Sequence, residues 1–323
     1  MSEAFTARVA ADELVLGPVR VSFMRTLRIP EEGLHPLPPG LGRFPLRRVE
    51  DYPDTVPPEW LARGGVMLPL YQREAMWISL DSDEPAALQI GIGKVCAVSG
   101  GAWSETLGQN PQNYAALPDQ PWLDGINAGD GFIRQFVAVP LGLGATVEGQ
   151  VTGAEDVGGV QLRAVGLTSD ALEEWRGQDE VVLGAGPVNE FLVCASAAPM
   201  GLGAGGRMSQ EVYEDDRDLA DYAEDRSGRV FVHLCSAAQW TAITGETPPP
   251  TPVDRKSYVD SGLPWFSYYD ADSEDLPPSS VLSGVSTVGT LLGDEDGPFT
   301  PVAPGSVVPI KGDGGEAITD GSW

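Results

Sequence analysis

The residues that could carry acid-base or nucleophilic chemistry are few in this chain. It contains only two histidines, His35 and His233, and three cysteines, Cys96, Cys194 and Cys235. Apart from His233 and Cys235, which are two residues apart, none of them has a His or Cys at the spacing of a zinc site. His233 stands within an apolar run, which favours a buried structural histidine over a general base. The sequence therefore predicts no catalytic residue, and it favours a non-enzymatic role.

One glycine-rich motif is a candidate for cofactor binding, and another pair of glycine-rich segments is a candidate internal repeat. GLGAGG at residues 201–206 matches the GxGxxG pattern, but the acidic residue expected after the next strand is missing. No cofactor is therefore predicted. PLGLGA at 140–145 also resembles PMGLGA at 199–204, which is either chance in a glycine-rich chain or a duplicated strand-turn unit.

Charge excludes some classes of partner. The chain has 47 acidic and 20 basic residues, a net charge of −27, which disfavours nucleic acid and anionic membranes. Acidic clusters at 81–84, 214–218 and 294–296 are either solvated loops or sites for a hard cation such as calcium. The identity of any metal stays open.

Aromatic side chains are the more informative class. Trp122 and Asp124 lie in DQPWLDG (residues 119–125), and Trp265, Tyr268 and Tyr269 lie in GLPWFSYY (residues 262–269). Such residues close the end of a sheet, stack on a sugar ring or anchor an interface. We therefore treat these five as candidate ligand or interface residues.

The elements that must position these residues are short. Forty glycines and 28 prolines interrupt the chain too often for long helices. Strands are predicted at 5–15, 19–29, 67–80, 88–98, 132–139, 145–152, 160–165, 181–183, 190–197 and 229–235. Helices are predicted at 170–175, 209–224 and 237–243.

This distribution predicts a mainly β fold. We expect an antiparallel β-sandwich or barrel with a few short helices, either as one unit or as two similar packed halves. The expected division is a β-rich N-terminal half at 1–168, a β-rich C-terminal half at 178–292 and a Gly/Pro/acid-rich arm at 293–323.

The C-terminal arm is a candidate interface. It contains seven glycines, four prolines and six acids around one apolar cluster, with Val307, Val308 and Ile310. We expect these three residues and Trp323 to contact a neighbouring subunit by strand addition.

Several phrases resemble those of a family of bacterial and fungal proteins of unknown function. They are VSFMRTLRIP (21–30), DQPWLDG (119–125), IRQFVAVP (133–140) and GLPWF (262–266). The resemblance covers the chain up to about residue 270 and implies no activity, cofactor or site residue.

Three functional hypotheses follow. The first is a structural protein that assembles with itself into a homo-oligomer or filament, its arm docking on a neighbour. The second is a carbohydrate-binding or carbohydrate-acting protein that uses loop tryptophans, with a glycan as partner. The third is a calcium-dependent binding module.

No secretory signal and no run of roughly 20 apolar residues is present, so we expect a cytoplasmic protein without a membrane span.

Overall fold

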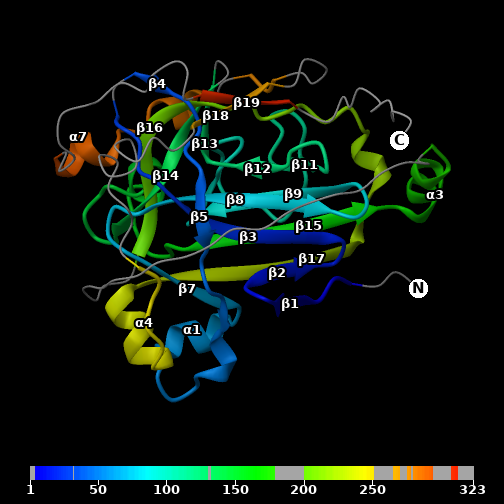
Figure 1. Ribbon diagram of the computed structural model, residues 1–323. Coiled ribbons are helices and arrows are strands. Elements are labelled where there is room, and N and C mark those ends of the chain that lie inside the picture. The colour runs from blue at the N-terminus through cyan, green and yellow to red at the C-terminus, as the bar shows by residue number, and fades with distance from the viewer. Residues whose placement is uncertain are drawn as a thin grey trace, which may run out of the picture.

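The computed structural model shows a mainly β, sandwich-like protein (Figure 1). It describes residues 4–31, 33–129, 132–178, 200–250, 265–269, 275–277, 279–293 and 307–311. Two large sheets enclose the main hydrophobic core, and one further pair of strands forms a small sheet of its own. The sandwich, rather than the barrel, is therefore the predicted alternative that the described strands adopt.

The first sheet has ten strands. Its main path is β1-β2-β3-β8-β14-β16-β4, and β12, β13 and β5 pair at the side with β8, β14 and β3. Its strands are β1 (Ala7–Ala10), β2 (Glu13–Leu16), β3 (Val19–Thr26), β4 (Leu34–His35), β5 (Gly40–Arg43), β8 (Ala75–Ser82), β12 (Trp122–Leu123), β13 (Gly125–Gly129), β14 (Phe132–Pro140) and β16 (Met200–Ser209).

The second sheet has seven strands, in the order β10-β9-β15-β17-β7-β6 with β11 on β9. They are β6 (Arg47–Arg48), β7 (Val66–Leu70), β9 (Ala86–Ile92), β10 (Val95–Cys96), β11 (Ala115–Leu117), β15 (Val160–Leu167) and β17 (Tyr222–Ser236). Each large sheet takes strands both from 1–168 and from 178–292.

The sheets are mixed, whereas the sequence predicted antiparallel pairing. β16 pairs parallel with β4, and β17 pairs parallel with β7. Parallel neighbours need a long connection, and both pairs join strands more than a hundred residues apart. The alternation of apolar and polar residues within one strand does not indicate which distant strand it pairs with, or in which direction.

The core forms because one face of each strand is apolar. On β15, Val160, Leu162 and Ala164 are fully buried, while Gln161 and Arg163 alternate with them on the other face. The main cluster combines such residues from both sheets. Burying a large apolar side chain stabilises a fold by about 1.5–3 kcal/mol, so this layer between the sheets holds the sandwich together.

Short helices close the ends of the sandwich. α1 (Pro58–Arg63) and α4 (Ala237–Thr244) pack around the buried Trp240 in a second apolar cluster. α3 (Ser169–Gln178) packs beside β15. The remaining elements are α2 (Val147–Thr152), α6 (Ser280–Ser283), α7 (Val288–Leu292), η1 (Val49–Asp51) and η2 (Leu219–Asp221). No helix of the described residues is long and apolar enough to cross a membrane.

Two predicted elements are wrong. Residues 145–152 form α2 rather than a strand, because the Thr146 hydroxyl caps the helix and Gly153 ends it in the left-handed region. Residues 209–224 hold the last residue of β16, η2 and the start of β17, rather than an α-helix. The helices predicted at 170–175 and 237–243 are confirmed as α3 and α4. The strands predicted at 181–183 and 190–197 lie outside the described residues.

The two glycine motifs have different structures. PLGLGA leaves β14 as a loop, whereas PMGLGA enters β16 from Met200 on, and Pro140 pairs with Met200 across the two strands. GLGAGG lies inside β16, with backbone neighbours on β14. A phosphate loop needs free amides at a strand-to-helix turn, so this segment lacks that geometry.

The apolar part of the C-terminal arm pairs within its own chain. β18 (Trp265–Tyr269) and β19 (Val307–Lys311) form a parallel two-stranded sheet, in which Trp265 pairs with Val307 and Tyr268 with Ile310. Figure 1 shows this pair on the side of the molecule opposite α1. Trp323 lies outside the described residues.

Candidate functional site

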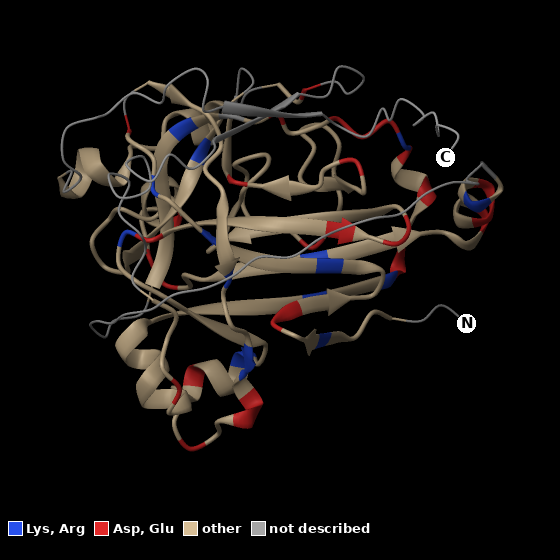
Figure 2. Cartoon of the chain, in the orientation of Figure 1, with Lys and Arg blue, Asp and Glu red and all other residues tan. Residues whose placement is uncertain are grey.

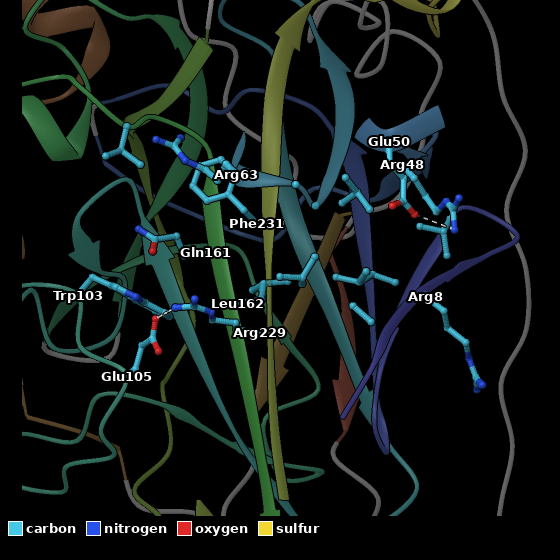
Figure 3. Close-up of a pocket in the computed structure, with 18 of the residues that line it drawn as sticks. Arg8, Arg48, Glu50, Arg63, Trp103, Glu105, Gln161, Leu162, Arg229 and Phe231 are labelled. Atoms are coloured by element: carbon cyan, nitrogen blue, oxygen red, sulfur yellow. Dashed lines mark hydrogen bonds and ion pairs between the residues drawn. The ribbon is translucent and has the colours of Figure 1, made fainter. Parts of the chain in front are cut away.

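An open groove of about 850 Å³ runs along the second sheet (Figure 3). Its walls come from β1, β6, β7, β15 and β17 and from the segment after β10. The lining residues are Ala7, Arg8, Val9, Leu14, Arg48, Glu50, Arg63, Gly64, Gly65, Val66, Lys94, Ala102, Trp103, Glu105, Val157, Gln161, Leu162, Arg229, Val230 and Phe231.

The groove exists because β17 changes neighbours along its length. One edge of β17 pairs with β15 continuously from Ser227 to Val232, and again at Tyr222 beyond a register shift. On the other edge, the Phe5 amide donates to the Ser227 carbonyl at 3.0 Å, and pairing with β7 begins only at Val232. Between Ser227 and Val232, this edge of β17 therefore faces the groove and does not pair with β1 or β7.

The floor of the groove is apolar. It is lined by Leu14 of β2, Val66 of β7 and Leu162 of β15, which all belong to the main core. Gly65 lets β7 approach β17 closely, since a Cβ there would lie 2.1 Å from the Phe231 carbonyl oxygen and its φ is +89°. A ligand in this groove meets an apolar slot beside a strand edge.

The rim of the groove is basic. Five of the chain's 20 basic residues line it, against two acidic residues, Glu50 and Glu105. The five are Arg8, Arg48, Arg63, Lys94 and Arg229. Figure 2 shows acidic residues in the loops and on α3, far more often than basic ones. Among the lining residues, bases therefore outnumber acids, whereas acids outnumber bases in the whole chain.

Some of these cations are already paired. Arg48 binds Glu50 at 3.0 Å, and Arg229 binds Glu105. Lys94 binds Asp156 at 2.9 Å. Arg63 instead lies over the Phe231 ring, with 4.6 Å between the guanidinium carbon and the ring centroid (Figure 3). Among the described residues neither Arg63 nor Arg8 has a carboxylate partner. Positive charge is thus available to a ligand in the groove.

An aromatic side chain lies across one end of the groove. The Trp103 ring covers Gly91 on β9, where a Cβ would approach Cε3 to 2.5 Å. Gln161 lies next to it (Figure 3). Glycine at residue 91 therefore lets the indole lie flat on the sheet, which is the arrangement of a stacking platform.

His233 does not supply a base to this site. Its ring stacks on Trp60 at 4.4 Å behind Phe231, and its Nε2 lies 2.9 Å from the Gly64 carbonyl oxygen. Burial lowers the pKa of His233 to about 4, so the imidazole is neutral at physiological pH. The prediction of a structural histidine agrees with this environment.

The candidate residues Trp122 and Asp124 lie on the first sheet, away from the groove. Trp122 is half-buried on β12, and its carbonyl accepts hydrogen bonds from Gln120 and Gln210. Asp124 is 2 % exposed, and its Oδ2 has no hydrogen-bond partner within the described structure. Burial raises the pKa of Asp124 to about 7, and a hydrogen bond from Trp122 opposes this rise.

The other candidates meet elsewhere. Trp265, Tyr268 and Tyr269 are on β18, and Val307, Val308 and Ile310 are on β19, so these six share one small sheet. The structure therefore brings these six residues into one strand pair. Trp122 and Asp124 do not belong to that pair.

The acidic clusters are occupied by protein groups. Arg20 binds Asp81 at 2.7 Å and Asp83 at 2.6 Å. Asp215 accepts the hydroxyl hydrogens of Tyr114 and Tyr222 at 2.8 and 2.6 Å. No group of three or more potential metal ligands occurs among the described residues, and the cluster at 294–296 lies outside them.

The sequence did not single out the groove residues. Arg63, Trp103 and Phe231 lie far apart along the chain and match no motif. The one local signal was Gly91, a glycine inside an apolar strand, which is typical of a close approach by another group.

Comparison with known proteins gives no match of any kind. No protein-family model, curated protein or solved structure matches the chain. The family resemblance of the quoted phrases therefore assigns no activity, and the function must be argued from the groove itself.

Proposed function

We propose that this protein acts by binding rather than by catalysis and assembles with copies of itself. In this proposal the basic groove of one copy receives the acidic C-terminal arm, residues 293–323, of another. The observation that carries the proposal is the gathering of five cations around an apolar slot on a chain of net charge −27.

Electrostatics supports this choice of surface. Two copies that each carry −27 repel one another wherever acidic faces meet. Charges within about 10 Å dominate at ordinary ionic strength, so a local basic patch can still attract an acidic segment. The arm has six acids and one lysine, Lys311, which gives it a charge complementary to the groove.

The shape of the groove supports the same partner. Val307–Lys311 already pairs with β18, so the part of the arm proposed to dock is 312–323. This stretch has Asp313, Glu316 and Asp320 for the basic rim and Trp323 for the apolar slot. The exposed edge of β17 offers backbone groups for strand addition.

The test is native mass by light scattering at low salt and at 0.5 M NaCl. We expect an oligomer at low salt, and its dissociation constant to rise at least roughly tenfold at high salt, because rim charges are screened. Deletion of 312–323, which keeps β19, should give a monomer. Equal masses for the full and shortened chains would overturn the proposal.

A matched pair of variants locates the contact. Arg63 and Arg176 both lie in the last turn of a short helix, but only Arg63 lines the groove. Arg63→Glu should weaken association, whereas Arg176→Glu changes the net charge equally and should leave it intact. Equal effects of the two substitutions would assign the interaction to overall charge instead of the groove.

A glycan binder is the second candidate, favoured by the Trp103 platform over Gly91. Its basic rim would suit an acidic oligosaccharide, with the sugar ring on the indole. Intrinsic fluorescence titrated with uronic-acid and neutral oligosaccharides tests this candidate. A quench that Trp103→Ala removes and Trp122→Ala retains supports it, and unchanged fluorescence with every sugar contradicts it.

A further inference from the structure

Two arginines face each other on the first sheet, on strands that the groove does not use. β14 and β16 run antiparallel, and Arg134 is the direct register partner of Arg207. Directly opposite residues project from the same face of a sheet. Both side chains are half-buried, and the Arg207 guanidinium lies 5.1 Å from the Phe132 ring centroid.

This pair lacks a countercharge of its own. Like charges directly opposite destabilise a sheet, yet neither guanidinium has a carboxylate within salt-bridge distance among the described residues. The Arg134 Nε is buried and has no hydrogen-bond partner there. A buried donor without a partner costs about 1–3 kcal/mol, so the arrangement calls for an acceptor.

The one acid that stabilises the charge of Arg134 within the described structure also binds other groups. Glu31 attracts Arg134 electrostatically, but its carboxylate binds Arg28 at 2.9 Å. It also accepts hydrogen bonds from the Thr290 amide at 3.0 Å and from the Gly289 amide. Burial, followed by the charge of Arg207, lowers the pKa of Arg134, which is the direction expected for a cation without a bound anion.

We propose that Arg134 and Arg207 form a binding site for one compact oxyanion of the phosphate type. Each guanidinium presents a planar fork of donors that matches the oxygens of phosphate. A single anion between the two forks would accept from the buried Nε and neutralise the repulsion across the strands. The site is independent of the proposed function, because it lies on other strands and needs no second copy.

Thermal unfolding of the full chain tests the site with inorganic phosphate as the probe. Phosphate is compared with chloride at equal pH and ionic strength. A ligand that binds only the folded state raises the midpoint, and we expect a rise of about 2 °C or more at saturating phosphate. Arg207→Gln should abolish the rise, while Arg176→Gln, a surface control on α3, should keep it.

A second readout separates binding from structural damage. In chloride alone, Arg207→Gln should be no less stable than the natural chain, since it removes a like-charge pair. The second measurement is the phosphorus-31 line width of inorganic phosphate, recorded with the natural chain and with Arg207→Gln. It reports binding directly and does not depend on unfolding. Broadening by the natural chain alone supports the site. No broadening, or equal midpoint shifts in both proteins, overturns it.

Discussion

Asp124 offers the sharpest test of how burial acts on this fold. Its side chain is 2 % exposed, and its Oδ2 lacks a hydrogen-bond partner among the described residues. Burial raises its pKa from an ordinary 3.8 to about 7. Replacement by asparagine keeps the shape and removes the charge at every pH, so Asp124→Asn isolates the cost of ionising this group.

The sign and size of the effect follow from linkage. Below pH 3.8 the acid is protonated in both states and costs nothing. As the pH rises to about 7, the unfolded chain loses the proton first, so the folded state loses stability. The rise of about three pH units, at about 1.4 kcal/mol each, gives a loss of about 4 kcal/mol, of which about 2 kcal/mol falls between pH 5 and pH 7.

Urea unfolding at pH 5, 6, 7 and 8 measures this loss. The free energy of unfolding of Asp124→Asn relative to the natural chain should increase by about 3 kcal/mol from pH 5 to pH 8. Any cost of the new amide is constant with pH and cancels from this comparison. Asp54→Asn, at an exposed residue, is the control and should show no such trend. A difference that stays constant within about 1 kcal/mol would refute the reasoning.

Three further predictions concern other parts of the fold. Glu74→Ala removes the partner of Arg25 in a buried ion pair of 3.0 Å. The free energy of unfolding, measured in urea, should fall by about 3–5 kcal/mol because a buried charge is left without its partner. A fall of less than about 1 kcal/mol would contradict the importance of this pair. Gly91→Val should displace the Trp103 indole from the sheet and shift tryptophan emission, while an unchanged spectrum would argue against the platform. The Glu155 carboxylate accepts hydrogen bonds from the amides of Gly142, Gly144 and Thr146, so Glu155→Ala should speed hydrogen exchange at these three amides. Unchanged exchange there would show that the loop keeps its structure without this carboxylate.

The candidate site was predictable only in part. Trp122 and Asp124 stand out in the sequence because aromatic and acidic residues share a proline turn, yet the fold buries Asp124. Arg63 and Trp103, which line the groove, have no distinguishing neighbours in the sequence. Local composition reports what a residue could do, whereas exposure depends on which strands cover it.

The sequence by itself determined the mainly β class and the charge. Frequent glycine and proline limit every element to a short length, and the alternation of residues 160–165 fixes which face of β15 is buried. The tertiary structure decided the rest. Parallel pairing of β17 with β7 joins segments more than a hundred residues apart. Within the described part of the chain, it leaves a length of β17 edge without a strand partner between the Phe5 contact and β7. Arginines from distant segments meet there because long-range packing, which no local pattern encodes, sets the order of the strands.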